Sequence, residues 1–450
     1  MPAPEALTGI EKATVIERDQ HSISRKSIAP NALKVLYRLG DHGYAAFIVG
    51  GGVRDILLDG KPKDFDIATD ATPEEVKEVF RNARIIGRRF KIVHIRFGRE
   101  VIEVTTFRAH HDPSNEIDEN ATRRQIGGLD SAHSSSGMIL RDNVYGNIDE
   151  DAMRRDFTVN ALYYTTNRFR ILDFCGGLDD LRERKLRMIG PAEERYREDP
   201  VRMLRAIRFA AKLGFTIEAS TEEPINELAP MLASISPARL FDECMKLMTN
   251  GHSAASFALL RQYRLGEYLF GPTLEAMPQA DPTAGKLVEL ALRNTDQRLA
   301  EDKSVTPAFL FAALLWPVLQ LRLSQVEANT VPHFQDIANE VILEQLQFTA
   351  VPRRFTIGTK EIWSLQNRLE RKNRRTVDSV FNHPRFRAAY DFLLLREEAG
   401  EDTGGLGDWW TAFQDGDTKQ RGDMLATLQK TGKKPGKRRR RRRKSSENTP

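Results

Sequence analysis

The chain has 450 residues, of which 40% are hydrophobic, 68 are Lys or Arg and 63 are Asp or Glu. This apolar content supports packed cores and excludes a globally disordered protein, and the length predicts roughly two or three domains. The net charge of +5 is unevenly distributed: residues 433–450 hold ten cations and one anion, or +9, which leaves −4 for residues 1–432. The basic charge therefore belongs to a C-terminal tail.

The cysteines and the apolar segments indicate a cellular compartment. Cys175 and Cys244 are the two cysteines, too few for a disulfide framework and without zinc-ligand spacing, which fits a reducing cytosol. The first twenty residues lack the apolar stretch of a secretory signal. The longest apolar run, residues 308–319, has twelve residues and includes Pro317, whereas a membrane span needs about 20. We therefore expect a cytoplasmic protein without an integral membrane segment.

The first 175 residues combine helical and strand patterns. Residues 1–27 are polar and predict an N-terminal arm. Apolar spacing and Gly or Pro boundaries predict helices at 30–39, 53–58 and from 72 onward, and strands at 44–49, 65–68, 83–86, 91–97 and 101–107. The helix from 72 begins with a capping box, formed by Thr72 and Glu75 around Pro73. Alternation in the last two strands predicts an antiparallel hairpin around Gly98.

The remaining chain is predicted to be mostly helical. Residues 109–137 are polar and too long for an ordinary loop, which indicates a mobile insertion or flap. A helix over 149–164 then leads to a strand at 169–173. Beyond residue 177 we predict no further strands, and helices at 178–184, 198–213, 236–250, 253–263, 306–322, 334–347 and 384–397. Periodicity is lost after residue 398, which predicts a flexible tail.

Two carboxylates form the first candidate site. Asp64 and Asp66 are two residues apart in a stretch that reads as extended, which places both side chains on one face of a strand. Neighbouring carboxylates repel one another, and a divalent cation relieves that repulsion. Mg²⁺ prefers one or two protein carboxylates together with substrate phosphates. Two such ions about 3.5–4 Å apart hold the attacking and leaving oxygens of a phosphoryl displacement.

A glycine turn precedes this pair. Gly50 and Gly51 lie between a predicted strand and a predicted helix, where backbone N–H groups and the helix N-terminus favour phosphate. Arg54, one turn into that helix, is placed to reach the same phosphates. The turn lacks the GK[ST] ending of a Walker A loop. Alone, each motif is more often a tight turn or a solvated strand end, but their order favours a site.

Three segments together resemble a known family. Residues 48–67 (IVGGGVRDILLDGKPKDFDI), 154–161 (RRDFTVNA) and 196–202 (YREDPVR) resemble, in this order, motifs of the class II nucleotidyltransferase superfamily. That superfamily contains bacterial poly(A) polymerases and tRNA CCA-adding enzymes. The resemblance is dense over residues 30–265 and weaker behind them.

The resemblance implies roles for individual residues. Asp64 and Asp66 are expected to be catalytic and to bind two Mg²⁺ ions, with Mn²⁺ as a substitute. Asp156 is expected to complete the active site or hold the ribose, and Glu103 is a candidate third carboxylate. Asp199 and Arg202 are expected to read the base edge. The implied nucleotide-binding residues are Gly50, Gly51, Arg54, Arg155, Asn160, Asp199, Arg202, Arg205 and Arg208.

The helix after residue 202 independently predicts an anion-binding face. Arg202, Arg205, Arg208 and Lys212 fall on one side of that helix, and Leu204, Ile207 and Ala211 fall on the other side. A solvated basic face is the alternative interpretation. The predicted RNA-binding residues are Lys212, Arg88, Arg89, Arg438, Arg439, Arg440, Arg441, Arg442 and Arg443, because arginine runs bind RNA through counterion release.

The fold implied by the resemblance is α+β. It consists of a nucleotidyltransferase head with a small mixed or antiparallel sheet and flanking helices, followed by an all-α neck and body and a disordered basic tail. The expected domains are an arm at 1–27, a catalytic head at 28–175, a nucleotide- and RNA-binding neck at 176–265, an RNA-binding body at 266–397 and an Arg-rich tail at 398–450.

One segment separates the two enzyme groups. Residues 85–95 (IIGRRFKIVHI) resemble the form found in bacterial poly(A) polymerases, and within them His94 reads as a strand residue rather than a ligand. Residues 306–316 and 379–396 resemble the C-terminal helices of the same group. The arginine tail agrees with an enzyme that must hold any RNA 3′ end.

The expected activity is template-independent polyadenylation of RNA 3′ ends, in which AMP is transferred from ATP by a two-metal mechanism and pyrophosphate is released. This reading implies a monomer that promotes RNA decay, with RNA-degradation machinery and RNA chaperones as possible partners. A tRNA CCA-adding enzyme is the first alternative. A noncatalytic RNA-binding protein on a degenerate scaffold is the second, and the intact motifs argue against it.

Overall fold

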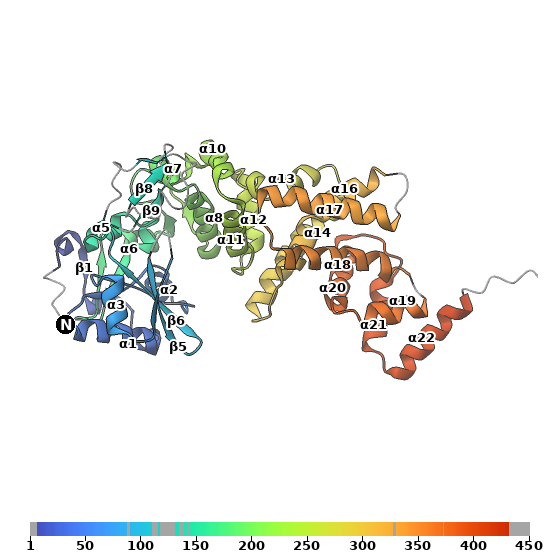
Figure 1. Ribbon diagram of the computed structural model, residues 1–450, viewed down its shortest axis with the longest axis horizontal. Coiled ribbons are helices and arrows are strands. Elements are labelled where there is room, and N and C mark those ends of the chain that lie inside the picture. Colours follow the sequence, from blue (N-terminus) through green and yellow to red (C-terminus); the bar gives the residue numbers. More distant parts are fainter. Residues whose placement is uncertain are drawn as a thin grey trace, which may run out of the picture. The chain divides into compact units, whose positions relative to one another are not determined.

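The computed structural model describes residues 7–87, 91–109, 116–117, 131–134, 139–142, 144–326, 330–371 and 373–431. The chain forms two compact units, Met1–Leu269 and Phe270–Pro450, and each has its own core (Figure 1).

An eight-stranded mixed sheet is the centre of the first unit. Its strand order is β1-β11-β10-β2-β3-β6-β5-β4, and β3 and β6 form a parallel pair. The strands are β1 (Thr14–Ile16), β2 (Ala46–Val49), β3 (Asp66–Thr69), β4 (Ala83–Ile86), β5 (Ile92–Phe97), β6 (Glu100–Thr106), β10 (Leu162–Thr165) and β11 (Arg170–Asp173). The register places Val49 opposite Asp66 on one side of β3 and Glu103 opposite Asp66 on the other.

Short helices cover this sheet. They are α1 (Pro30–Asp41), α2 (Gly51–Leu57), α3 (Pro73–Val79), α5 (Ile148–Met153) and α6 (Gly177–Arg182). A core of Phe47, Val49, Phe107, Tyr163 and Leu172 joins the inner strands to α5. The predicted capping box of α3 is confirmed, because the Thr72 hydroxyl accepts from the Glu75 amide and the Glu75 carboxylate accepts from the Thr72 amide. Two further small sheets contain β7 (Glu116–Ile117), β8 (Ser131–Ser134) and β9 (Ile139–Asp142), and β12 (Lys185–Leu186) and β13 (Thr216–Ile217).

Helices complete the first unit. They are α7 (Ala192–Glu198), α8 (Val201–Leu213), α9 (Ala219–Glu222), α10 (Ile225–Leu228), α11 (Pro237–Met248) and α12 (Ser253–Gln262). Helix α8 packs against both α11 and α12 (Figure 1). Most of its apolar residues are buried, whereas Arg205 and Lys212 on its basic side form ion pairs with Asp156 and Asp55. Single-turn 3₁₀ segments lie at Ile10–Lys12, Arg18–Gln20, Arg25–Ser27, Thr158–Asn160 and Ala229–Ser234. Helix α13 (Glu267–Ala276) is kinked at Phe270, where the two units meet in sequence.

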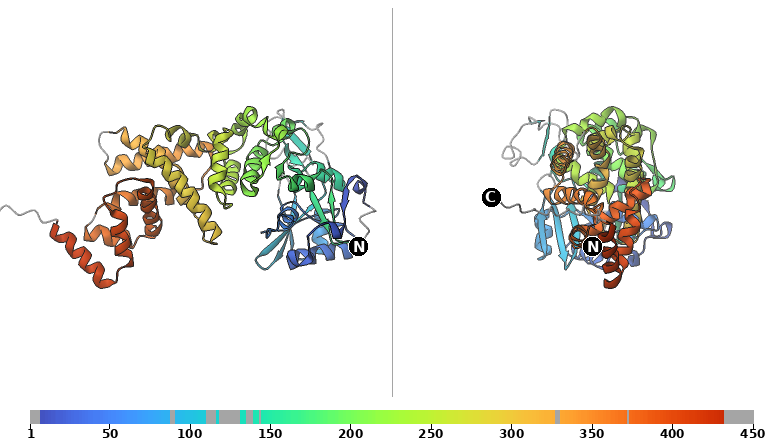
Figure 2. Two further views of the ribbon diagram at one scale, coloured as in Figure 1. Left: turned by 180° about the vertical axis from the view of Figure 1, so that it is seen from behind. Right: turned by 90° about the vertical axis from the view of Figure 1, so that its right-hand side faces the viewer.

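The second unit is helical throughout its described residues (Figure 2). Its helices are α14 (Pro282–Ala300), α15 (Pro307–Leu314), α16 (Trp316–Ser324), α17 (Val331–Phe348), α18 (Arg353–Leu369), α19 (Arg374–Phe381), α20 (Phe386–Ala399), α21 (Leu406–Asp415) and α22 (Thr418–Thr431). No single helix in the described part of the chain is long and apolar enough to span a membrane. The consecutive helices α15 and α16 together have the length and composition of a membrane span, but they are bent by 42° and most of their residues are buried.

Three predicted helices differ from the observed ones. The helix expected at 149–164 ends at Met153, and the residues after it form a 3₁₀ turn and strand β10 between β2 and β11. The helix expected at 198–213 is α8 and begins only at Val201, because Pro200 disfavours helical geometry at Asp199, which is extended; Glu198 ends the preceding helix α7. The helix expected at 306–322 is two helices, and Pro317 lies in the first turn of the second.

Several boundaries were also wrong. The polar arm contains β1, which pairs with β11 and buries Ile16, so the first 27 residues are not a separate arm. The short strands β12 and β13 lie beyond residue 177, where none was expected. The flexible tail expected from 398 contains α21 and α22, because Leu406, Trp410 and Phe413 enter the core of the second unit. Most of the predicted insertion at 109–137 lies outside the described residues.

Candidate active site

A cavity of about 500 Å³ lies in the first unit and collects most of the predicted site residues. Its lining contains seven Lys or Arg and four Asp side chains. The excess of cations favours binding of a polyanion, and Asp64 and Asp66 give part of the wall an acidic character. The lining residues are Gly50, Gly51, Arg54, Asp55, Lys63, Asp64, Asp66, Arg155, Asp156, Asn160, Arg205, Arg208, Phe209, Lys212, Lys246, Thr249 and Asn250.

The glycine turn joins β2 to α2 at one wall of the cavity. Gly50 has φ 68° and ψ −134°, a conformation that side chains rarely adopt. A Cβ atom on Gly52 would lie 3.3 Å from both Ile48 and Phe65, so the turn packs closely on the sheet. The backbone at Gly50 and Gly51 therefore approaches the cavity without a covering side chain, as the sequence predicted.

The two predicted metal-binding carboxylates line this cavity together. Asp66 is the first residue of β3, whereas Asp64 lies before the strand, so their shared face does not come from strand pleating alone. Burial raises the pKa of Asp66 to about 6, and the nearby charges of Glu103 and Asp64 add to the effect. The metal-free site thus carries uncompensated negative charge.

This donor set fits a divalent cation that is shared with a substrate. No group of three or more His, Cys, Asp or Glu side chains within the described residues is arranged to hold an ion alone. Mg²⁺ usually takes one or two protein carboxylates and completes its shell with water and phosphate oxygens. Asp64 and Asp66 meet that requirement, and the charge repulsion at Asp66 gives a physical reason for a cation to bind there.

Glu103 lies beside the pair but makes a different contact. It is opposite Asp66 in the β3–β6 register, and it is not among the residues that line the cavity. His94 Nε2 on β5 lies 3.1 Å from Glu103 Oε1. Glu103 is therefore the side-chain partner of His94 within the sheet, and its charge raises the pKa of Asp66.

Asp156 is held by several donors. Its Oδ2 accepts from Arg205 Nε at 2.7 Å, and its Oδ1 accepts from Asn160 Nδ2 at 3.1 Å and from the Phe157 amide at 2.8 Å. Arg205 and these hydrogen bonds hold the pKa of the buried Asp156 well below its usual range. The carboxylate is therefore ionised and fixes the positions of Arg205 and Asn160.

The same network continues to the glycine-turn helix. Arg54 is 2% exposed, and its Nη1 donates to Asn160 Oδ1 at 2.5 Å. Its Nε and Nη2 donate to Asp55, whose other oxygen accepts from Lys212 at 2.9 Å. Arg54 therefore connects α2 directly to the 3₁₀ turn at Asn160 and, through Asp55, to Lys212 on α8. Each of its three side-chain nitrogens already donates a hydrogen bond.

Three arginines surround one aromatic ring at the α8 side of the cavity. The guanidinium carbons of Arg54, Arg205 and Arg208 lie 5.0, 5.4 and 5.0 Å from the centre of the Phe209 ring. Such cation–π contacts hold guanidinium groups in place without neutralising them. The cavity therefore keeps a strong positive potential next to the two carboxylates.

Two donors in the cavity lack a partner. Arg208 Nε and Asn250 Nδ2 are buried without a hydrogen bond among the described residues. Burial and the neighbouring Arg205 lower the pKa of Arg208. Because an unmade hydrogen bond at a buried donor is costly, both atoms favour a ligand that accepts hydrogen bonds.

Arg155 is buried at another wall. Its Nε donates to the Tyr163 hydroxyl at 2.7 Å and its Nη2 to Asp151 Oδ2 at 3.1 Å. The charge of Asp151, together with these bonds, raises the pKa of Arg155 although burial opposes it. A Cβ atom on Gly50 would lie 3.7 Å from Arg155 Nη1, so this group is adjacent to the glycine turn.

The two residues predicted to read the base are not among those lining the cavity. Asp199 Oδ2 accepts from Arg239 Nη2 at 2.7 Å, and Arg202 Nη1 donates to Glu198 Oε2 at 2.6 Å. Both side chains are thereby fixed at the start of α8. Lys212, by contrast, lines the cavity as expected, whereas Arg88, Arg89 and Arg438–Arg443 lie outside the described residues.

Sequence reasoning missed part of the wall. Lys246, Thr249 and Asn250 come from the end of α11 and the turn after it, and Lys63 comes from the loop before β3. Lys63 lies within the motif at residues 48–67 but was not predicted to be a site residue. The α11 residues carry no local signal, because only the packing of α11 on α8 brings them to the cavity.

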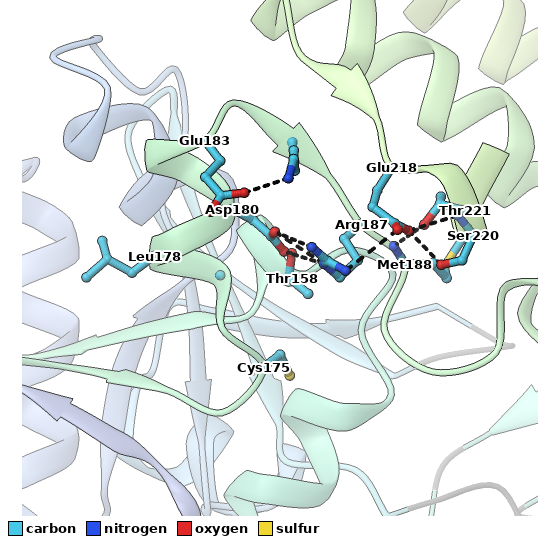
Figure 3. Close-up of polar contacts among 12 residues, drawn as sticks. Thr158, Cys175, Leu178, Asp180, Glu183, Arg187, Met188, Glu218, Ser220 and Thr221 are labelled. Carbon is cyan, nitrogen blue, oxygen red and sulfur yellow. Dashed lines mark hydrogen bonds and ion pairs between the residues drawn. The ribbon is translucent and has the colours of Figure 1, made fainter.

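A second polar network links the RRDFT segment to the neighbouring helices (Figure 3). Thr158 Oγ1 donates to the buried Asp180 at 2.6 Å, and Asp180 accepts from Arg187 Nε at 3.1 Å. Arg187 Nη1 lies 3.8 Å from Glu218, which caps α9. The turn that carries Asp156 and Asn160 is therefore tied to the strands β12 and β13.

Family models match the chain in three places. A poly A polymerase head domain covers residues 46–187, a probable RNA- and SrmB-binding site of polymerase A covers 214–277, and a polymerase A arginine-rich C-terminus covers 326–445. The first match contains most of the sheet, with Asp64 and Asp66, the second contains β13 and the helices α9 to α13, and the third lies in the second unit.

Curated relatives align over nearly the whole chain. The poly(A) polymerase I of Salmonella typhimurium is 45% identical and the alignment covers 92% of this chain and 89% of the relative. The poly(A) polymerase I of Haemophilus influenzae is 43% identical, and the alignment covers 94% of this chain and 93% of the relative. The CCA-adding enzyme of Geobacillus stearothermophilus is 37% identical, but over only 53% and 54%.

Solved structures share the fold. The CCA-adding enzyme of Bacillus stearothermophilus in complex with CTP is 27% identical, with a TM-score of 0.55 over 89% of this chain and 83% of that one. An apo tRNA-processing enzyme gives a TM-score of 0.57 at 22% identity, over 91% and 98%, and supports the fold alone. Because near-complete alignments at more than 40% identity are to poly(A) polymerases, the chain belongs to the bacterial poly(A) polymerase family.

Proposed function

We propose that this chain adds AMP units from ATP to RNA 3′ ends without a template and releases pyrophosphate. The observation that carries the proposal is the cavity in which Asp64 and Asp66 lie beside the basic face of α8. The alignments with the two poly(A) polymerases cover 92% and 94% of the chain, whereas the alignment with the CCA-adding enzyme covers 53%, which supports polyadenylation over CCA addition.

The carboxylate pair is assigned the metal ions. Asp64 and Asp66 would hold Mg²⁺, with Mn²⁺ as a substitute, and we propose two ions. When bound, the ions supply charge that activates the RNA 3′-hydroxyl and neutralises the departing pyrophosphate. The contribution of the chain is to hold the two carboxylates next to one another in a cavity that otherwise attracts anions.

The triphosphate is assigned to the basic walls. The backbone at Gly50 and Gly51 offers N–H groups at the N-terminus of α2, and Arg205, Arg208 and Lys212 lie opposite on α8. The unpartnered Arg208 Nε provides one donor for this purpose. Arg54 donates from all three of its side-chain nitrogens and Arg155 from Nε and Nη2, so both hold the walls in place.

Asp156 and Asn160 are assigned to ribose positioning. Asp156 is ionised and already bound by Arg205 and Asn160, so it acts as the fixed point of the nucleotide wall rather than as a free metal ligand. Glu103 lies opposite Asp66 on the neighbouring strand but does not line the cavity, so it is assigned an electrostatic effect on Asp66 and no metal.

Base selection is assigned to Asp199 and Arg202. A carboxylate and a guanidinium side by side present an acceptor and a donor to a base edge. Their partners Arg239 and Glu198 restrict both side chains, which supports selection of one base by a rigid surface. An involvement in RNA decay, with degradation enzymes or RNA chaperones as partners, stays a prediction.

Incubation with single nucleotides tests the function. A tRNA that lacks its 3′ CCA and an unstructured RNA are each supplied with one NTP and Mg²⁺, and the products are separated by length. Long tails from ATP on both RNAs are expected. Incorporation of CTP into the tRNA alone would instead identify a CCA-adding enzyme, and RNA binding without any AMP transfer would revive a noncatalytic protein.

A further inference from the structure

A second cationic hollow lies in the helical unit, apart from the active-site residues. It has a volume of about 300 Å³ and is formed by the start of α17, the end of α18 and the start of α19. We call it the arginine groove, after Arg368, Arg371 and Arg375 in its wall. Its other polar groups include the hydroxyls of Ser364, Thr376 and Ser379, and no acidic side chain is found among the described residues that line it.

The charge of the groove is not neutralised by its neighbours. Neither Arg371 nor Arg375 has an ion pair within the described residues, and both are exposed. The nearest carboxylate in sequence, Glu370, lies 3.8 Å from Arg396 instead. Arg368 Nη2 donates to Ser379 Oγ at 2.8 Å, an interaction that leaves its charge in place.

Helix electrostatics explain only part of this arrangement. Arg368 lies in the last turn of α18, and Arg371 follows it, where cations stabilise a helix. Arg375 lies in the first turn of α19, where a cation is unfavourable and anions are preferred. The first turn of α19 contains no acidic residue, and no ion pair joins Arg375 to Asp378, one turn further along, within the described residues. The Asn373 side chain already caps this terminus by accepting from the Thr376 amide at 3.0 Å, so an external anion would chiefly compensate for the arginines.

The shape and chemistry of the groove fit a nucleic-acid backbone. Arginine forks match phosphate oxygens, and Ser, Thr and Asn side chains commonly contact phosphate and sugar. Val331, which is 53% exposed, adds an apolar surface at the rim. Such a set holds a strand without reading its sequence.

We propose that the arginine groove binds the phosphate backbone of single-stranded RNA, as a second binding surface outside the active site. The choice of RNA as the polyanion rests on the proposed function. Arg371 and Arg375 each bind a phosphate, and Arg368 positions Ser379 at the wall.

The salt dependence of RNA binding tests this assignment. The full-length protein is titrated with a labelled unstructured RNA at several salt concentrations, without ATP or divalent metal. Because each bound phosphate of a single strand contributes about 0.7 to the slope of log K against log[salt], Arg371→Gln with Arg375→Gln should reduce that slope by about 1.4. At 0.1 M salt, this corresponds to affinity weaker by roughly 25-fold.

Two matched variants separate local charge from other effects. Arg371→Lys with Arg375→Lys keeps the charges and should retain most of the slope. Arg387→Gln removes a cation from the same unit, but that side chain is paired with Asp391 at 3.0 Å and is 67% exposed, so its slope should stay at the wild-type value. Thermal unfolding verifies that every variant is folded.

A wild-type slope in the folded double Gln variant overturns the proposal. A loss of about 0.7 in the Arg387→Gln variant, the same loss for each charge removed, does so as well, because the effect would then be general charge. The outcome is independent of catalysis, since no ATP is present. If the single-nucleotide assay finds no AMP transfer while the slope changes as expected, the groove remains an RNA site and the proposed function alone fails.

Discussion

At the residue scale, the site combines one strained carboxylate with one well-compensated carboxylate. Asp66 is buried next to Glu103 and Asp64, which raise its pKa, whereas Asp156 is bound by Arg205 and Asn160, which lower its pKa. At Asp66 the carboxylates repel one another, and a bound cation would relieve this repulsion. At Asp156 the interactions with Arg205 and Asn160 stabilise the fold. The two aspartates, both expected to be catalytic, should therefore respond oppositely when their charge is removed.

Asp66→Asn should stabilise the metal-free protein. One pKa unit is about 1.36 kcal/mol, so the rise from 3.8 to about 6 corresponds to roughly 3 kcal/mol as an upper bound. Because the pKa in the folded state lies above that in the unfolded state, the cost is complete above pH 6 and disappears as pH falls through 6 toward 3.8. Thermal unfolding in EDTA at pH 7.5 and pH 4.5 measures it. A lower melting temperature of the variant at pH 7.5 would contradict the electrostatic assignment.

Asp156→Ala should destabilise the protein by about 1–3 kcal/mol, because it leaves the partly buried Arg205 guanidinium and the Asn160 amide without their acceptor. Chemical denaturation at pH 7 measures the loss. Since the pKa of Asp156 is depressed in the folded state, its contribution is present above the ordinary Asp pKa and is lost as pH falls below it. In a double-mutant cycle with Arg205→Ala, independent effects of the two changes would rule out this pairing.

At the element scale, local signals predicted the strands and the helix starts of the front half. The capping box at Thr72 was confirmed because it depends only on neighbouring residues. The helix predicted over 149–164 was wrong because a strand between β2 and β11 takes its second half. Asp64 and Asp66 were recognisable from their spacing, whereas Lys246 and Asn250 reach the cavity only through the packing of α11 on α8.

Helix α21 belongs to the core of the second unit, although the sequence lost its periodicity there. Trp410 is fully buried, donates from Nε1 to the Leu369 carbonyl at 3.1 Å and packs on Phe386 and Phe413. Trp410→Ala should therefore cost about 3–5 kcal/mol of unfolding free energy. Urea unfolding of the second-unit transition measures this loss. Removal of residues 433–450 is the control and should leave that transition unchanged; a negligible effect of Trp410→Ala would restore the flexible-tail interpretation.

At the scale of the whole molecule, the charge separates two kinds of RNA binding. The body is slightly acidic overall, so its cations act locally in the active-site cavity and the arginine groove, whereas residues 433–450 carry +9. We predict that the local cations position an RNA strand and that the tail attracts it without regard to sequence.

Deletion of residues 433–450 should weaken RNA binding and flatten its salt dependence, by about 0.7 in slope for each phosphate that the tail neutralises in the wild type. Equilibrium binding of a labelled RNA across a salt series measures the change. A tail-deleted protein with the wild-type slope would exclude the arginine run from RNA binding. The arginine-groove variants should lower the slope further in this background if the groove and the tail bind separate phosphates.

The most direct measurement is AMP incorporation from ATP into a single-stranded RNA, compared for the wild type, Asp64→Ala and Asp66→Ala at saturating Mg²⁺. We predict long tails from the wild type, and a loss of at least about 10³-fold in both variants with RNA binding largely retained, since the carboxylates act on the reaction through the metal. Near-wild-type turnover by either folded variant would contradict the account.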